Sequence, residues 1–398
     1  MQSHKLWTKD FIGASFINFF LTLVFYLLIV TMATYAIEQY HASISTSGLV
    51  SGLFVIGGLT GRLISGALIH KLGANRLLII TISICIILIG LYFMDFGIVF
   101  LVLLRFLHGV PHGMALTAIS SIVAQNIPES RKSEGINYYS MSTTLATAFG
   151  PFLGIFMTQH TTFPVLFLVC LILMGLSLMI SFSVKVISDD QSQALHTKAL
   201  KFKDIIKNSI EINTIPIGII ILLLSFAYSG VLTYLNLYAS QINLTHIASF
   251  FFIMYSIMVF LSRPLTGKLM DYRGHNIVMY PAFIFYALSM FMLSTVNNGF
   301  VLLLIGGIMG LGFGNLQSAT QVIAVKSASK SRISVATSTY FICFDAGLGL
   351  SPYLLGYITP ITGYAHMFGL MAIIILLTGI IYFLIHGLKE TKEKLAKL

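Results

Sequence analysis

The stretch RLISGALIHKLGANR occupies residues 62–76, and the stretch RPLTGKLMDYRG occupies residues 263–274. A shift of 201 residues places Arg62 on Arg263 and aligns the glycines and a leucine of the two stretches. The same shift pairs positions far outside them: Gly109 with Gly310, Gly113 with Gly314, Arg131 with Arg332, and Pro151 with Pro352. One constant offset over so much of the chain predicts two halves that arose by duplication.

Long apolar runs surround both stretches and fill most of the 398 residues. Hydrophobic residues make up 57% of the chain and charged residues only 9%. A soluble chain has about a quarter of its residues charged, so a soluble globular enzyme is excluded and no enzymatic activity is expected. Apolar runs of about 20 residues cross a bilayer as helices. The sequence therefore predicts an all-α integral membrane protein, with 12 transmembrane helices in two six-helix pseudo-repeats. The expected spans are 11–36, 45–68, 77–94, 98–121, 135–158, 164–184, 213–238, 247–269, 278–295, 300–323, 334–358 and 366–386.

One long polar segment, residues 185–211, divides these spans into two groups of six. We interpret residues 1–184 as an N-terminal six-helix bundle, 185–211 as a cytoplasmic linker, and 212–398 as a C-terminal six-helix bundle with a short tail. Two related groups of helices are an architecture of secondary transporters, which hold their substrate near the bilayer midplane at the repeat interface.

The chain carries 23 Lys and Arg against 13 Asp and Glu, a net charge of +10. All of these cations except Arg62, Arg105 and Arg263 fall on the same side of the predicted spans. Positively charged loops face the cytoplasm, so both termini and the linker are expected there, in the cytoplasmic membrane of a bacterium. The excess of positive charge is therefore explained by the membrane topology. The expected partner is the lipid bilayer, and no nucleic-acid partner is expected.

The cysteines lie inside apolar runs at unrelated spacings, and we interpret all three as buried apolar residues. They are Cys85, Cys170 and Cys343. No disulfide framework and no metal site is predicted, because His108 and His112 have the spacing of two ligands but the sequence identifies no third.

Four short motifs resemble the major facilitator superfamily. Residues 66–76 match its G-x-L-x-D-x-x-G loop followed by basic residues, except that His70 replaces the acid, and residues 267–274 repeat the pattern with Asp271 in place. Residues 105–109 resemble its R-x-x-x-G pattern, and residues 150–154 the G-P-x-x-G core of a motif associated with exporters. The resemblance implies the major facilitator fold, alternating access, and a latch on the inner side in which Asp271 carries more of the gating than His70.

The expected gating residues lie in these motifs or, for two arginines, a few residues before the loop motifs inside the predicted spans. They are Arg62, Gly66, Gly73, Arg263, Asp271, Gly150 and Pro151. The Gly-Pro pair removes a side chain and a backbone donor, which makes a helix bendable; the alternative is a kink that only improves packing. For the two arginines, snorkelling to the interface and contact with substrate are the alternatives.

Ionisable groups inside membrane spans are functional candidates. Arg105, His108 and His112 share one helical face, and Asp345 is the one acid well inside a span. We expect Asp345 and His112 to carry the coupled proton. A permanent salt bridge for Asp345 and hydrogen bonds to neighbouring helices for the histidines are the alternatives. The expected substrate-binding residues are Arg105, His108, His112, Asn18, Tyr228 and Asn315.

Three intramembrane arginines against one deep acid favour an anionic or zwitterionic cargo. The leading hypothesis is a monomeric, proton-coupled exporter of a small polar metabolite, with the proton gradient as energy source and no cofactor. High Ile, Lys and Phe usage is typical of AT-rich bacterial genomes, in which an opine-type metallophore such as staphylopine is a fitting cargo. The alternatives are a multidrug efflux pump, an importer of an organic anion, and a membrane receptor or scaffold without transport.

Overall fold

The computed structural model describes residues 6–128, 131–184, 210–329 and 332–390, without the side chains of Lys132, Ser133, Asn137 and Ser334. Every regular element in these residues is a helix. The elements are α1 (Lys9–Tyr40), α2 (Ile44–Leu72), α3 (Ala74–Gly90), η1 (Leu91–Phe93), α4 (Gly97–Asn126), α5 (Lys132–His160), α6 (Phe163–Ser181), η4 (Ile212–Thr214), α8 (Ile215–Gln241), α9 (Thr245–Arg273), α10 (Asn276–Ser294), α11 (Gly299–Met309), η5 (Gly310–Gly314), α12 (Asn315–Lys326), α13 (Ile333–Tyr382) and η7 (Phe383–Gly387).

Within the described residues, 11 helical stretches are long and apolar enough to cross a membrane. The last of them, Val335–Glu390, has 56 residues, more than twice the roughly 20 that one crossing needs. Gly363 divides it, because its φ of 78° and ψ of 162° are not helical. Counting its two parts separately confirms the predicted all-α membrane fold with twelve spans.

The duplication is visible in the backbone. Helices α2 and α9 both have 29 residues, and each begins and ends 201 positions from its counterpart. A glycine with positive φ follows each helix, Gly73 with 79° after α2 and Gly274 with 77° after α9. A residue with a Cβ rarely adopts this conformation, which makes glycine the usual stop for a helix.

Glycines also set the spacing between equivalent helix pairs. A Cβ on Gly109 of α4 would overlap the carbonyl oxygen of Phe54 on α2, and a Cβ on Gly310 would overlap that of Tyr255 on α9. A Cβ on Gly113 would likewise overlap the carbonyl oxygen of Gly58 on α2. Small residues let membrane helices approach backbone to backbone, so Gly109 and Gly310 serve the same packing in both halves. A Cβ on Gly314, the repeat counterpart of Gly113, would instead meet the side chain of Val259.

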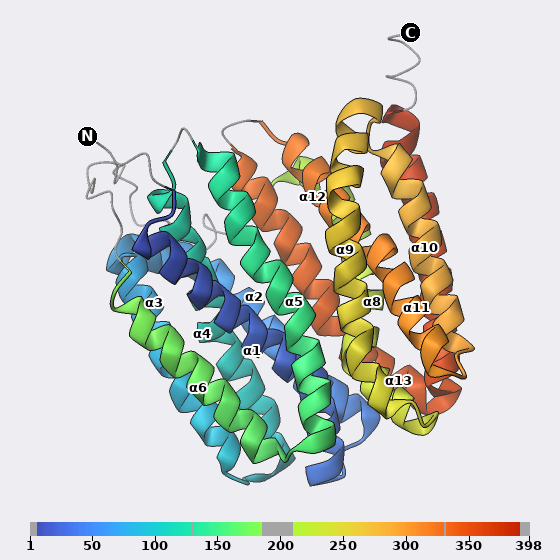
Figure 1. The fold of residues 1–398 in the computed structure, drawn as a ribbon, viewed down its shortest axis with the longest axis horizontal. Helices are drawn as coiled ribbons and strands as arrows, with labels where there is room; N and C mark the ends of the chain where they lie inside the picture. The colour runs from blue at the N-terminus through green and yellow to red at the C-terminus, as the bar shows by residue number, and fades with distance from the viewer. Residues whose placement is uncertain (1–5, 129–130, 185–209, 330–331, 391–398) are drawn as a thin grey trace. The chain divides into compact units, whose positions relative to one another are not determined.

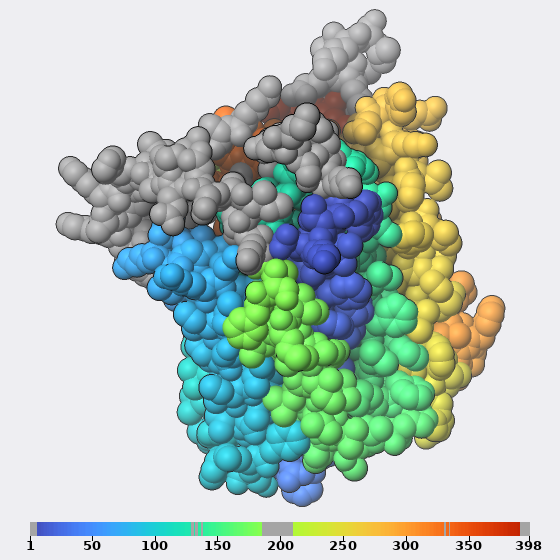
Figure 2. All heavy atoms as spheres, turned by 60° about the vertical axis from the view of Figure 1, so that its left-hand side comes forward, coloured from blue at the N-terminus to red at the C-terminus, as the bar shows by residue number. Residues whose placement is uncertain are grey.

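The chain divides into two compact units, and the first comprises Met1–Ala42 and Leu53–Leu200. Its central helix is α1, which packs against α4, α5 and α6, while α3 packs against α4 and α6. Figure 2 shows α6 on the surface of this unit, between α3 and α5. Gly150 and Gly154 bring α5 against Tyr26 and Val30 of α1.

The second unit comprises Ser43–Gly52 and Lys201–Leu398. In it α8 and α10 pack against α13, and α9 packs against α11 (Figure 1). The first turns of α2 belong to this unit, because Gly48 and Gly52 lie against the carbonyl groups of Pro352 and Gly349. The predicted linker, residues 185–211, lies outside the described residues apart from Ile210 and Glu211.

Candidate functional site

Three of the predicted site residues meet in the interior of the first unit. Arg105 and His108 are 0% exposed and His112 is 1% exposed. The guanidinium of Arg105 lies 4.2 Å from the ring centroid of Phe54, a cation–π distance. It also donates a hydrogen bond of 3.3 Å to the hydroxyl of Tyr92, whose oxygen lies 3.0 Å from Nδ1 of His108. The predicted single face of α4 is therefore buried against aromatic side chains.

Aromatic rings enclose the two histidines. The ring of Phe54 lies 5.0 Å from that of His108 and 5.1 Å from that of His112. Phe25 stacks on His112 at 6.1 Å. Nε2 of His108 and both ring nitrogens of His112 are buried without a hydrogen-bond partner among the described atoms. Such groups are destabilising unless a ligand engages them.

The structure adds a residue that sequence reasoning missed. Cys85 of α3 is 0% exposed. Its sulfur and one ring nitrogen each of His108 and His112 all lie within 4.8 Å of one another. The sequence shows the i, i+4 spacing of the histidines but not which part of α3 faces them. Cys85, His108 and His112 together form a grouping that could hold a metal ion.

Asn18 lies elsewhere in the first unit, in a network that joins α1 to α5. Its amide nitrogen donates to the hydroxyls of Ser142 at 2.8 Å and Thr143 at 2.9 Å, and its amide oxygen accepts from Tyr139 at 2.9 Å. The Tyr139 hydroxyl lies 3.2 Å from that of Ser120 on α4. These bonds hold three helices together, whatever further role Asn18 has.

Asn315 and Tyr228 lie in the second unit, around the π-helical turn η5. The amide of Asn315 bonds to Ser262 and Thr266 of α9 and to the carbonyl of Leu311. Tyr228 stacks on Phe313 at 4.1 Å. Single π-helical turns are frequent at functional sites, and this one places an aromatic ring beside α8.

Asp345 lies on α13 in the second unit and is 5% exposed.

The predicted gating residues differ in burial. Arg62 and Arg263 are half-buried, Gly66, Gly73 and Asp271 are exposed, and Gly150 and Pro151 are buried. Helix α5 continues through Pro151 to His160. The proposed roles of these residues stay predictions.

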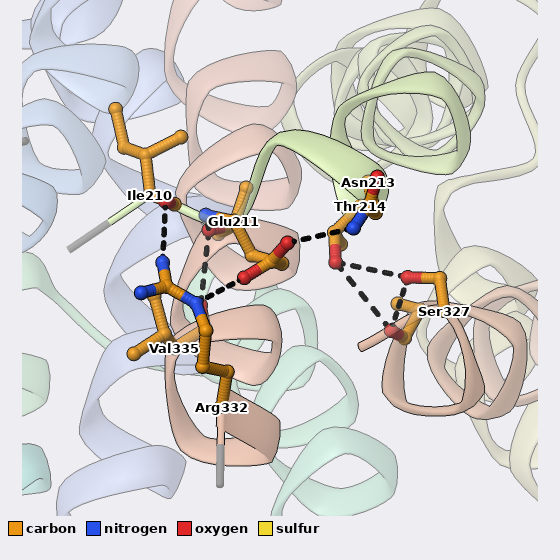
Figure 3. A network of polar contacts seen from close by, with 9 residues as sticks. Ile210, Glu211, Asn213, Thr214, Ser327, Arg332 and Val335 are labelled. Atoms are coloured by element: carbon orange, nitrogen blue, oxygen red, sulfur yellow. Dashed lines mark hydrogen bonds and ion pairs between the residues drawn. The ribbon is translucent and has the colours of Figure 1, made fainter. Parts of the chain in front are cut away.

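Within the second unit, a polar network ties the residues before α8 to the beginning of α13 (Figure 3). The guanidinium of Arg332 pairs with the carboxylate of Glu211 and donates to the carbonyl of Ile210. Glu211 also accepts from the Asn213 amide at 3.1 Å, and its backbone N–H donates to Thr339. The Arg332 hydrogen bond lowers the pKa of Glu211 below its ordinary 4.5. The sequence predicts Arg332 as the repeat partner of Arg131 and as a cytoplasmic loop cation, and does not indicate its pairing with Glu211.

A second grouping with metal-ligand chemistry comprises His275, His386 and Glu390. Here the Glu390 carboxylate accepts from the backbone N–H groups of His275 at 2.7 Å and Asn276 at 3.1 Å. A carboxylate on the first N–H groups of a helix is a cap. We therefore interpret this grouping as the contact that ties Glu390, just after η7, to the beginning of α10.

A groove of about 1050 Å³ lies between α10 and α13 in the second unit. Its walls are mostly apolar and include Phe291, Ile361 and Leu376. None of the predicted site residues is among the residues that line it. An apolar depression on a membrane helix pair accommodates lipid chains, so we do not interpret it as a solute site.

Comparison with known proteins identifies what the fold resembles. The sequence profile of the Major Facilitator Superfamily matches residues 14–306 and 246–397. The staphylopine export protein of Staphylococcus aureus is 22% identical over 353 residues, covering 85% of this chain and 86% of that protein. An uncharacterised MFS-type transporter of Bacillus subtilis is 25% identical over 358 residues, 86% of this chain and 87% of its own.

Solved structures share the fold at low sequence identity. The nucleoside transporter NupG superimposes with a TM-score of 0.78 at 13% identity, covering 94% of this chain and 99% of that one. A peptide transporter, POT, gives a TM-score of 0.76 at 14% identity, covering 95% and 94%.

Proposed function

Because the chain belongs to the Major Facilitator Superfamily, we propose that it is a proton-coupled exporter of a small anionic or zwitterionic metabolite. It is a multi-pass membrane transporter and not an enzyme. The direction of transport, its coupling to protons and the identity of the cargo are our proposals. Placement in the cytoplasmic membrane with both termini inside, and action as a monomer, belong to the same proposal.

The observation that carries the cargo class is the charge of the membrane interior. Arg105 is fully buried and Arg62 and Arg263 are half-buried, whereas Asp345 is the one acid well inside a predicted span. Charges in a low-dielectric interior act strongly on a solute. An interior with this surplus attracts carboxylate or phosphate groups and repels lipophilic cations.

Two observations support export. The G-P-x-x-G sequence of residues 150–154 lies on a helix seated against α1. The similarity to the staphylopine export protein extends over 85% of the chain. An opine-type metallophore is zwitterionic and rich in carboxylates, so it fits the charge argument and is our narrowest proposal for the cargo.

Proton coupling is assigned to Asp345. A carboxyl group in the membrane shifts its pKa as its surroundings alternate between wet and dry, which allows it to load and release a proton. His112 was the other predicted carrier, but it is enclosed by Phe25 and Phe54.

The test compares metabolites inside and outside cells that contain or lack the protein. We expect one or a few anionic or zwitterionic metabolites to accumulate inside cells that lack it. The wild type should restore their release, as should the control Asp95→Asn, which changes an exposed loop acid. Asp345→Asn, present at equal membrane levels, should reduce release to the level of cells without the protein, and a protonophore should do the same to the wild type.

Other results identify the alternatives. Loss of tolerance to several unrelated drugs, with unchanged metabolite pools, would establish a multidrug pump. A growth requirement for one anionic nutrient after deletion would establish an importer. Full activity of Asp345→Asn against a proton gradient would remove the coupling role of this residue.

A further inference from the structure

The grouping of Cys85, His108 and His112 goes beyond a solute-transport function. Its three ligand atoms lie within 4.8 Å of one another, and all three residues are at most 1% exposed. They come from two helices, α3 and α4, that pack against each other inside the first unit. We propose that these residues bind one resident copper ion, as Cu(I).

The hydrogen bonds of the site leave its ligand atoms available. Nδ1 of His108 is engaged by the Tyr92 hydroxyl at 3.0 Å, while Nε2 of His108 and both nitrogens of His112 have no partner among the described atoms. Tyr92 oxygen can accept from both Arg105 and His108 Nδ1–H, which leaves Nε2 free to bind an ion. A second hydrogen bond that fixes the ring of a metal-binding histidine is usual.

The ligand types and the surrounding charge select the metal. Two imidazoles and one thiolate form a donor set that proteins use for copper, and soft thiolates favour Cu(I). Binding displaces the thiol proton, so a Cu(I) thiolate with two neutral imidazoles has no net charge. A divalent ion would add a positive charge beside the buried guanidinium of Arg105, and structural zinc sites use four ligands. The described residues offer three here.

The distances require a small closure. Metal bonds to nitrogen and sulfur are about 2.0–2.3 Å long, which places the ligand atoms roughly 3.5 Å apart. The ligand atoms lie no more than 4.8 Å apart, so the closure needed is at most about 1.3 Å, within reach of rotations of the cysteine and histidine side chains. The ion would then link α3 to α4 and engage one nitrogen of each histidine that has no hydrogen-bond partner among the described atoms.

This inference does not depend on the proposed cargo or direction of transport. It assigns His108 and His112 to a metal site in place of the substrate and proton roles that the sequence predicts for them. An experiment can distinguish the metal-ligand role from the substrate or proton role. If the histidines are metal ligands, replacing either one should remove the metal, and this can be measured without a transport assay.

The experiment uses the full-length protein, purified anaerobically in detergent from cells grown with added copper. We expect about one copper per chain by mass spectrometry, and one sulfur and two nitrogen neighbours by X-ray absorption. In a competition titration with a chromogenic Cu(I) chelator, Cys85→Ser and His112→Gln should each weaken binding by at least about 100-fold. Tyr92→Phe, which removes a supporting hydrogen bond, should weaken it by about 10–100-fold.

The matched control is Cys170→Ser, which replaces a cysteine that is also 0% exposed but lies outside the grouping. It should retain copper. Ag⁺, a redox-inert probe, should raise the unfolding temperature of the wild type and of Cys170→Ser but not of His112→Gln. Wild-type protein without copper, copper bound without a sulfur neighbour, or equal copper affinity in all variants would overturn the proposal. The wild-type measurements decide this even where a variant fails to fold.

Discussion

Glu211 and Arg332 show how one residue pair makes stability depend on pH. The Arg332 guanidinium lowers the pKa of Glu211 in the folded protein. A carboxyl group whose folded pKa lies below its unfolded value stabilises the fold above the unfolded value, and this contribution disappears as pH falls through the folded pKa. The pair should therefore stabilise the second unit at neutral pH and lose this effect in acid.

We expect Glu211→Gln to lower the unfolding temperature at pH 7, with the difference from wild type shrinking between about pH 5 and pH 3. Glu134→Gln is the control, because its partner Arg131 is the repeat counterpart of Arg332 but that ion pair is 34% and 42% exposed. An exposed pair contributes about 0–1 kcal/mol, so a small effect is expected. The measurement is thermal unfolding in detergent across this pH range. A difference in unfolding temperature between wild type and Glu211→Gln that does not change with pH would contradict the stabilising role of the ionised Glu211.

At the scale of the element, close helix packing depends on glycines whose positions recur in both halves. Gly109→Val would drive a side chain into the backbone of α2, and Gly310→Val would do the same to α9. Overpacking destabilises by about 1–3 kcal/mol. We expect both variants to unfold at lower temperature and to give less monodisperse protein on size-exclusion chromatography.

Gly175→Val on α6 provides the matched control for this prediction. A Cβ on Gly175 meets no atom within 4 Å, so the same chemical change should leave the unfolding temperature close to that of the wild type. If Gly109→Val and Gly175→Val behaved alike, the close approach of α2 and α4 would not be needed for stability.

At the scale of the whole molecule, the placement of the 23 Lys and Arg predicts the orientation in the membrane. We expect a cysteine at Arg76 to face the cytoplasm and one at Asn297 to face outward; both positions are exposed. In a Cys343→Ser background, the remaining cysteines, Cys85 and Cys170, are 0% exposed. A membrane-impermeant maleimide should label Asn297→Cys in intact spheroplasts and Arg76→Cys only after permeabilisation, and the reverse pattern would invert the topology.

Much of the fold could be predicted because its signals are local or repeated. Apolar runs of membrane-spanning length predicted the twelve spans, with ends close to the observed ones, for example 45–68 against α2 at Ile44–Leu72. The offset of 201 residues predicted the repeat that α2 and α9 reproduce. The shared face of Arg105, His108 and His112 followed from helical periodicity alone.

The partners of these residues were not predictable in the same way. Cys85 beside the two histidines depends on how α3 is rotated and shifted against α4. Glu211 beside Arg332 depends on packing between segments 121 positions apart. Asn315 was predicted to contact substrate, yet its amide bonds to α9, a contact that no spacing within α12 reveals.

The sequence by itself determined that this protein lies in a lipid bilayer, where its helices are and that its halves are duplicated, because hydrophobicity and helical period act along the chain. Its family followed from the resemblance of short motifs. The tertiary structure decided which side chains on different helices meet, because that depends on the backbone approach that glycines allow and on the packing of large side chains between helices. The proposed copper site belongs to this second kind. Its ligands acquire a common chemistry only when α3 and α4 are packed together.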